Sequence, residues 1–199
     1  RGMAFDDKNG YSITKDLLVN HSFSSYQPAP PKTNGFGIYL HVPYCRHRCS
    51  YCDFFSNTEA PEFERFSEKI VREIGQSGPW WQEFARSTTV DTVFFGGGTP
   101  SLLPSLARTK ILDAIRQNFK WNSSVEVTLE TNPEDVTTEF IAGLLPSGIN
   151  RLSLGVQSFQ PHFLDALDRK CRPDTVFKAV KLIQESGFEN WSLDFIMGI

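Results

Sequence analysis

Short apolar runs alternate with segments of helical period from residue 36 to the last residue. Five runs have the length and composition of β-strands, at residues 37–42, 90–95, 125–130, 151–156 and 191–197. Between them apolar residues recur every three or four positions, as Phe63, Phe66, Ile70 and Ile74 do before Gly75. Strands that alternate with helices are typical of parallel β/α units. The pattern therefore predicts an α/β fold with a parallel sheet.

The later helices are predicted from the same periods and from their glycines and prolines. The segment that follows residue 104 places Leu106 and Ile111 on one apolar side. The segment at 140–145 is predicted to be stopped by Pro146 and Gly148, and the last two helices to begin at Pro161 and Pro173.

Residues able to do chemistry follow the carboxyl ends of these strands. They are a cysteine loop, a glycine-threonine turn at 96–99, Glu130, Gln157 and Asp194. In a β/α barrel such ends converge on one mouth, whereas a doubly wound sheet concentrates them at a single switch point. The distribution over all five strands favours the barrel.

The two ends of the chain differ from this middle part. Residues 1–35 are rich in serine and proline and have no sustained apolar period, which predicts a flexible N-terminal tail or linker. The run at 191–197 stops with no helix to cover it, so residues 36–199 are interpreted as an incomplete, C-terminally truncated barrel.

Charge and hydropathy restrict the partners. The 199 residues contain 20 Lys and Arg against 23 Asp and Glu, a net charge of −3, so no global basic field favours nucleic acid. No run reaches the roughly 20 apolar residues of a membrane span. A cytoplasmic protein is predicted, with the mitochondrial or plastid matrix as the alternative if the tail is a targeting remnant.

Three of the four cysteines stand in one short loop, as C-x3-C-x2-C at Cys45, Cys49 and Cys52. Three thiolates on one loop favour a four-iron cluster with one iron left open. Zinc stays open as the alternative, because the spacing lacks a second pair of ligands. Its fourth ligand would have to come from a more scattered set, namely His41, His47, Asp53 or Cys171.

The residues around these cysteines fit a charged, shielded cluster. Arg46, His47 and Arg48 are expected to offset the negative charge of the thiolates. Aromatic neighbours are expected to limit the access of water, which tunes a cluster's potential, and they are Tyr44, Tyr51, Phe54 and Phe55.

Five segments in order resemble the radical S-adenosylmethionine proteins related to oxygen-independent coproporphyrinogen III oxidase. They are IYLHVPYCRHRCSYCDF at 38–54, VFFGGGTPS at 93–101, LETNP at 129–133, RLSLGVQSF at 151–159 and LDFIMGI at 193–199. The resemblance implies a partial β/α barrel in which Cys45, Cys49 and Cys52 bind a [4Fe-4S] cluster. S-adenosylmethionine would occupy the open iron, and an electron from a donor protein would cleave it to methionine and a 5′-deoxyadenosyl radical.

The resemblance also implies the residues that contact S-adenosylmethionine: Tyr39, Tyr51, Gly97, Gly98, Thr99, Glu130, Gln157, Arg169 and Asp194. Glu130 would bind the ammonium group, Arg169 the carboxylate, and Asp194 the ribose hydroxyls. The structural alternatives are a local salt bridge for Glu130 and a solvated helix position for Arg169. Cys171 is expected to be a free thiol near the barrel mouth.

One position separates two subgroups of this family. Coproporphyrinogen dehydrogenases carry a further cysteine where this chain has Phe54, and the Cys-Asp-Phe form resembles the HemW-type haem chaperones. Haem binding, through a C-terminal region outside this chain, and a haem-acceptor protein are therefore implied. Radical decarboxylation of coproporphyrinogen III and a zinc-stabilised domain without redox chemistry are the alternatives.

Overall fold

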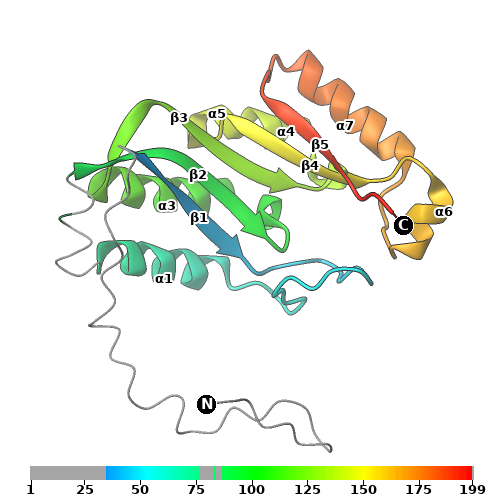
Figure 1. Cartoon of the computed structure of the whole chain (residues 1–199), viewed down its shortest axis with the longest axis horizontal. Helices are drawn as coiled ribbons and strands as arrows, with labels where there is room; N and C mark the ends of the chain where they lie inside the picture. Colours follow the sequence, from blue (N-terminus) through cyan, green and yellow to red (C-terminus); the bar gives the residue numbers. More distant parts are fainter. Residues whose placement is uncertain (1–34, 77–82, 84–86, 199) are drawn as a thin grey trace, which may run out of the picture. The chain divides into compact units, whose positions relative to one another are not determined.

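The computed structural model describes residues 35–76, 83 and 87–198 of the chain (Figure 1). The first strand begins at Gly35, the last residue of the predicted tail and two residues before the predicted start of this strand. Residues 1–34 lie outside the described part, so the flexible tail stays a prediction.

Five parallel strands form one sheet: β1 (Gly35–Val42), β2 (Thr89–Gly97), β3 (Lys120–Thr131), β4 (Arg151–Gln157) and β5 (Trp191–Phe195). Their spatial order is their order in the chain, β1-β2-β3-β4-β5. A doubly wound sheet reverses its strand order at a switch point, and none occurs within these five strands. The sheet therefore has the β/α-barrel arrangement that the sequence predicts.

Helices follow the strands as predicted (Figure 1). They are α1 (Phe63–Gly75), α3 (Ser105–Asn118), α4 (Thr138–Ala142), α5 (Leu144–Ser147), α6 (Pro161–Ala166) and α7 (Pro173–Glu185), with short 3-10 turns η3 (Pro100–Leu102) and η4 (Pro133–Asp135). Pro161 and Pro173 begin α6 and α7, where a missing backbone N–H costs nothing. None of the described helices is long and apolar enough to cross a membrane.

Two predictions about the helices are wrong. Pro146 does not end a helix: α4 stops before Gly143, and Pro146 lies in the first turn of α5, where no N–H is needed. The predicted stop at Gly148 is confirmed, because the chain leaves α5 there with a φ of +91°, which favours glycine. Leu106 is exposed, because the buried stripe of α3 follows Ala107, Ile111 and Ile115 instead.

The strands are also longer or shorter than their apolar runs. β2 continues through Gly97, and β3 begins at Lys120, where Thr89 and Val90 pair with Lys120 and Trp121. Backbone pairing continues through polar residues that an apolar run does not include. β5 ends at Phe195, two residues earlier than predicted.

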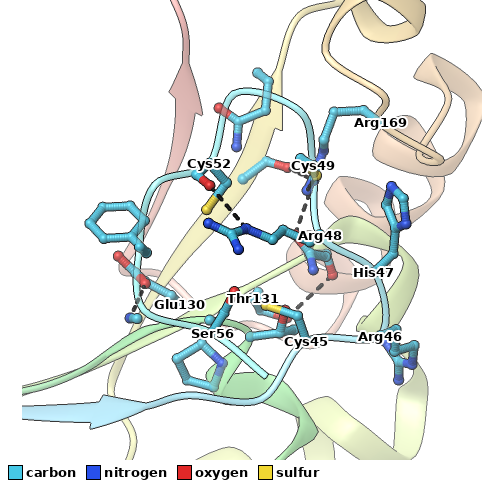
Figure 2. A pocket seen from close by; sticks show the side chains of 18 of the residues that line it. Cys45, Arg46, His47, Arg48, Cys49, Cys52, Ser56, Glu130, Thr131 and Arg169 are labelled. Carbon is cyan, nitrogen blue, oxygen red and sulfur yellow. Dashed lines mark hydrogen bonds between the residues drawn. The ribbon is translucent and has the colours of Figure 1, made fainter. Parts of the chain in front are cut away.

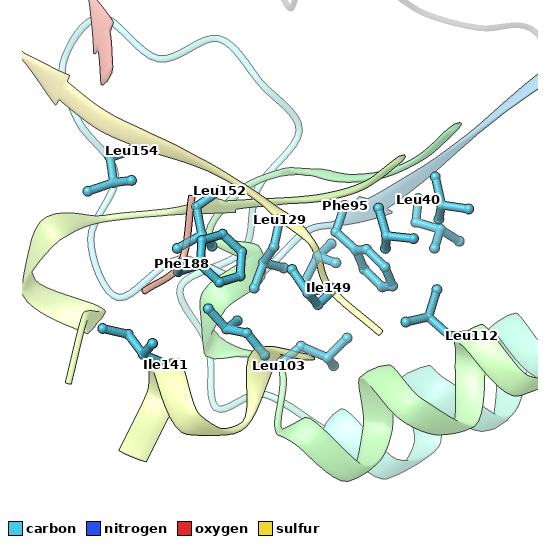
Figure 3. Packing of buried hydrophobic residues seen from close by; sticks show 14 of the residues in the cluster. Leu40, Phe95, Leu103, Leu112, Leu129, Ile141, Ile149, Leu152, Leu154 and Phe188 are labelled. Carbon is cyan, nitrogen blue, oxygen red and sulfur yellow. The ribbon is translucent and has the colours of Figure 1, made fainter. Parts of the chain in front are cut away.

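The hydrophobic core lies between one face of the sheet and the helices (Figure 3). Successive strands contribute Leu40, Phe95, Leu129 and Leu152, which pack with apolar residues such as Leu112 of α3. Because side chains alternate across a strand, the neighbours of these residues point to the other face of the sheet. That second face leads to the candidate site.

Candidate functional site

A pocket with a volume of about 340 Å³ lies at the carboxyl ends of the strands (Figure 2). This volume falls within the range of small-ligand sites. Its lining includes Cys45, Cys49 and Cys52. It also includes eight of the nine residues predicted to contact the cofactor: Tyr51, Gly97, Gly98, Thr99, Glu130, Gln157, Arg169 and Asp194. Cys45 and Asp194, which are 149 positions apart in the sequence, thus line one cavity.

The ninth residue, Tyr39, does not line this pocket. Its side chain is exposed on the neighbouring surface, and its hydroxyl lies 3.2 Å from Nδ1 of His41. His41 is in turn held through Nε2, 2.8 Å from the carbonyl oxygen of Phe55. The structure therefore places Tyr39 beside the cysteine loop without bringing it to the other predicted contacts.

The cysteine loop, residues 43–57, is fixed to the sheet by backbone hydrogen bonds. The N–H of Cys45 donates to the carbonyl of Asn57 at 2.9 Å, and the N–H of Thr99 donates to the carbonyl of Tyr44 at 2.7 Å. Within the loop, the N–H of Cys52 donates to the carbonyl of Cys49 at 3.1 Å. Both ends of the loop are thus set by the backbone, next to the turn that follows β2.

Polar donors lie beside two of the three free thiols. The hydroxyl of Thr99 is 3.6 Å from Sγ of Cys45, and Nη1 of Arg169 is 3.8 Å from Sγ of Cys49. Hydrogen bonds to sulfur tune an iron–sulfur cluster, so these donors fit such a group. Among the described residues, no three His, Cys, Asp or Glu side chains already form a group that could hold a metal ion. That finding concerns a single ion, whereas a four-iron cluster takes one thiolate on each of three different irons.

A fourth protein ligand for zinc is less available. His41 bonds to Phe55, and Nε2 of His47 lies 2.8 Å from the carboxylate of Asp168. Cys171 is buried at 4% exposure, and burial raises the pKa of its thiol to about 12. Because a metal ligand must be a thiolate, Cys171 is poorly suited to bind one. It is a free thiol buried in the hydrophobic core, where it interacts with Glu134 and Arg169, two residues that line the pocket.

The glycine turn makes room for the cysteine loop. A Cβ atom on Gly98 would stand 2.7 Å from the carbonyl oxygen of Tyr44 and 2.9 Å from Sγ of Cys45. Gly97 has a φ of +114°, and a Cβ there would meet the ring of His41 at 2.7 Å. Both positions therefore require glycine for packing against the loop, besides any approach to a cofactor.

Glu130 lies at the end of β3 and faces the pocket. The backbone N–H of Gly97 donates to its carboxylate at 3.2 Å. Burial raises the pKa of Glu130, and the nearby Asp194 raises it further, whereas the Gly97 hydrogen bond and His41 oppose the shift. Glu130 forms no ion pair within the described part of the chain, so the predicted alternative of a local salt bridge is not observed. A cationic ligand would relieve this unfavourable environment.

Asp194 is held by a residue that the sequence did not indicate. The hydroxyl of Ser153 lies 2.9 and 2.8 Å from the two carboxylate oxygens of Asp194. Ser153 is also paired in register with Glu130 on the neighbouring strand, so all three residues share one face of the sheet. Strand alternation counted back from Gln157 along β4 could have identified Ser153, because Ser153, Gly155 and Gln157 all line the pocket.

Arg169 is buried, with 8% of its surface exposed, and lies between α6 and α7. Its Nη2 donates to the side chain of Asn132 at 3.0 Å and to the carbonyl of Gly155 at 2.6 Å. Its Nε is buried with no hydrogen-bond partner among the described residues. The alternative of a solvated helix position is thus wrong, and the guanidinium is a buried cation at the wall of the pocket.

Gln157 and Tyr51 line two further walls of the pocket. Gln157 has a φ of +68° at the end of β4, and its carbonyl accepts from the N–H of Ile196 at 3.0 Å. Burial raises the pKa of Tyr51 to about 12, so its hydroxyl remains protonated at neutral pH.

The cations of the cysteine loop have different partners. Arg46 forms an ion pair with Asp135, and His47 pairs with Asp168. Figure 2 shows the Arg48 side chain among the three cysteines, where its Nε lies 3.4 Å from the carbonyl of Cys52. The predicted compensation of thiolate charge therefore depends on Arg48 and Arg169.

Comparison with known proteins agrees with this site. Residues 39–199 match the family model described as the Radical SAM superfamily. The chain is 37% identical over 170 residues to the heme chaperone HemW of Mycobacterium tuberculosis (strain CDC 1551 / Oshkosh), covering 85% of this chain and 44% of that protein. It is 33% identical over 165 residues to heme chaperone HemW of Escherichia coli (strain K12), covering 81% and 42%.

A solved structure shares the same fold. Coproporphyrinogen III oxidase (HemN) from Escherichia coli, described as a radical SAM enzyme, aligns with a TM-score of 0.73 at 25% identity. The alignment covers 86% of this chain and 39% of that chain, so the chain spans less than half the length of the proteins it matches. Sequence, fold and site geometry together lead to one assignment: the chain belongs to the radical S-adenosylmethionine superfamily.

Proposed function

We propose that Cys45, Cys49 and Cys52 bind a [4Fe-4S] cluster, that the adjoining pocket binds S-adenosylmethionine, and that the protein is a haem chaperone. The observation that carries this proposal is the shared cavity, which collects three thiols together with acidic and basic side chains. Three thiolates satisfy three irons of such a cluster and leave the fourth for a ligand.

The pocket residues divide the recognition of the cofactor among them. The Glu130 carboxylate would accept hydrogen bonds from the ammonium group, and this cation would stabilise the ionised form that burial disfavours. Arg169 provides a cation for the carboxylate, and Asp194, fixed by Ser153, accepts from the ribose hydroxyls. The bound cluster supplies one electron for reductive chemistry on S-adenosylmethionine.

Similarity to heme chaperones supports haem as the cargo. The relatives that match over more than four fifths of this chain are named heme chaperone HemW. Phe54 stands two positions after Cys52, as in the haem chaperone subgroup that the sequence resembles. An electron donor protein, a haem-acceptor protein and a cytoplasmic location complete the proposal.

A second candidate is radical decarboxylation of coproporphyrinogen III, which the structural likeness to the oxidase from Escherichia coli favours. A third, a zinc-stabilised domain, is supported only by the cysteine spacing, because three of the four candidate fourth ligands are engaged or buried.

Anaerobic reconstitution of the intact protein with iron and sulfide distinguishes these functions. Our proposal predicts four irons per chain, binding of S-adenosylmethionine, and haem that remains bound through gel filtration with no turnover of coproporphyrinogen III. Formation of protoporphyrinogen would instead establish the oxidase, and a colourless zinc protein without iron would establish the third candidate. The Cys171→Ala variant is the matched control, because it removes a thiol outside the pocket.

A further inference from the structure

The segment between Cys45 and Cys49 is fastened from two directions by carboxylates distant in sequence. Arg46 pairs with Asp135 of η4, and His47 pairs with Asp168 after α6 at 2.8 Å. The two pairs differ in burial. Both side chains of the His47 pair are about 40% exposed, whereas the Arg46 pair joins an Arg46 side chain that is 61% exposed to an Asp135 side chain that is only 4% exposed. Fully exposed pairs contribute little, so the pair with one buried member is the stronger constraint on the loop.

Asp135 is anchored to the fold independently of the loop. The hydroxyl of Ser101, in η3, donates to its second carboxylate oxygen at 2.6 Å. The backbone N–H of Asp135 donates to the carbonyl of Asn132 at 3.0 Å. A desolvated carboxylate needs a cationic partner, and among the described residues Arg46 is the only cation paired with it. The buried carboxylate of Asp135 therefore restrains the cysteine loop through its ion pair with Arg46.

The Asp135 side chain does not line the pocket, whereas Arg46 and the adjacent Cys45 do. Any effect of Asp135 on a bound group must thus pass through Arg46 and the loop backbone.

We propose that Asp135 is a positioning residue that, through its ion pair with Arg46, holds the cysteine loop in place before the cluster is assembled. This inference rests on the proposed function, because the cluster is the group whose assembly benefits. An ordered loop loses less conformational freedom when three thiols converge on iron, so the cluster is retained longer.

Single and double variants separate positioning from a merely structural ion pair. Arg46→Gln or Asp135→Asn alone removes one partner, and Arg46→Gln leaves a buried charge uncompensated. The double variant Arg46→Gln/Asp135→Asn removes both charges, so the stability of the metal-free protein recovers, while the loop remains unfastened. Arg46→Lys keeps the charge and is the rescue variant.

The experiment uses the intact protein, reconstituted anaerobically. We expect the melting temperature of the metal-free protein to fall in Arg46→Gln and to recover in the double variant. Iron release to a chelator is expected to be severalfold faster in both single variants and in the double variant, and near normal in Arg46→Lys. Alkylation of Cys45 and Cys49 by iodoacetamide in the metal-free protein should accelerate in parallel. Arg172→Gln is the matched control, because it breaks an exposed ion pair with Asp165.

Two results overturn the inference. Iron release that follows the melting temperature, and so returns to normal in the double variant, makes the pair structural only. Unchanged iron release and alkylation in all variants, with a wild-type protein that holds a full cluster, removes the inference and leaves the proposed function intact. A wild-type protein that takes up no cluster overturns both.

Discussion

The two faces of the same five strands differ in what they require of the sequence. On the helix side, Phe95, Leu129 and Leu152 are fully buried among apolar side chains. On the other side, Glu130 and Ser153 are the direct neighbours of these leucines and line a pocket with cysteines and charged groups. One residue along a strand thus separates a position that sustains the fold from one that lines the pocket.

This contrast explains how a stable sheet can carry an unfavourable site. The helix side gains free energy by removing apolar surface from water, about 1.5–3 kcal/mol for each large side chain. The pocket side keeps a carboxylate whose pKa is raised by burial and a guanidinium nitrogen with no partner among the described residues. Such groups cost stability in the empty protein and favour binding of a complementary ligand.

The largest effect is expected from Cys49→Ala, which should abolish the brown absorbance of the reconstituted protein. Three thiolates are the minimum that this loop offers, and the melting temperature without metal should change little because Cys49 is outside the core. Iron analysis and absorption spectra check this, and a variant that still holds four irons would show that the loop is not the ligand.

Leu152→Ala and Ser153→Ala test the contrast between adjacent residues of β4. Leu152 is fully buried, so its truncation should lower the free energy of unfolding by about 2–5 kcal/mol. Ser153→Ala removes one hydrogen bond to Asp194 and should cost about 0.5–1.5 kcal/mol. Urea unfolding of the intact protein measures both, and equal losses would contradict the division between the two faces.

Glu130→Gln should weaken binding of S-adenosylmethionine roughly 10- to 100-fold, the value of one charge-assisted hydrogen bond of about 1.5–3 kcal/mol, while iron content stays unchanged. Isothermal titration of the reconstituted protein measures this. An unaltered affinity would exclude Glu130 as the ammonium partner.

The same carboxylate predicts a pH dependence. Burial raises the pKa of Glu130, so the group becomes protonated at a higher pH than an ordinary glutamate as the solution is acidified. Because the ammonium group binds the ionised form, affinity should fall as the pH decreases through this raised pKa, and Glu130→Gln should not show that fall. The sign for folding is opposite: the native state holds this proton more tightly than the unfolded state, so this group's contribution to stability decreases as the pH rises through the same range.

The smallest effect is expected for alkylation of Cys171. Burial raises the pKa of its thiol to about 12, so iodoacetamide at neutral pH should label the three loop cysteines of the metal-free protein and leave Cys171 unlabelled until the protein is denatured. Mass spectrometry of the peptides resolves the four sites, and rapid labelling of Cys171 in the native protein would contradict its place in the core.

Periodicity and turn residues predict most of the fold, because each strand and helix has a recognisable pattern within its own short stretch of sequence. All five strands, their parallel direction and the starts of α6 and α7 follow from the sequence. The extension of β3 to Lys120 does not, because its pairing with Thr89 is a contact between distant residues. The division at Gly143 does not follow either, because it depends on backbone hydrogen bonds from the N–H of Gly143 to the carbonyls of Glu139 and Phe140, which an apolar period does not record.

Residue types at strand ends predict the members of the site but not their partners. The positions of Glu130, Gln157 and Asp194 at one mouth follow from strand parity. Ser153 and Asp135 were missed, since a serine and an aspartate acquire their roles only when a distant group meets them. Tyr39, by contrast, was predicted as a contact but does not line the cavity, although it is close to the cysteines in sequence.

The turn after β2 has a consequence for how this protein could change. A methyl group on Gly98 would press on the carbonyl of Tyr44 and on the sulfur of Cys45 at once. One added carbon at this point would displace either the loop backbone or the thiol of Cys45. The seat of the proposed cluster thus depends on the absence of a side chain at a residue that is not itself a ligand.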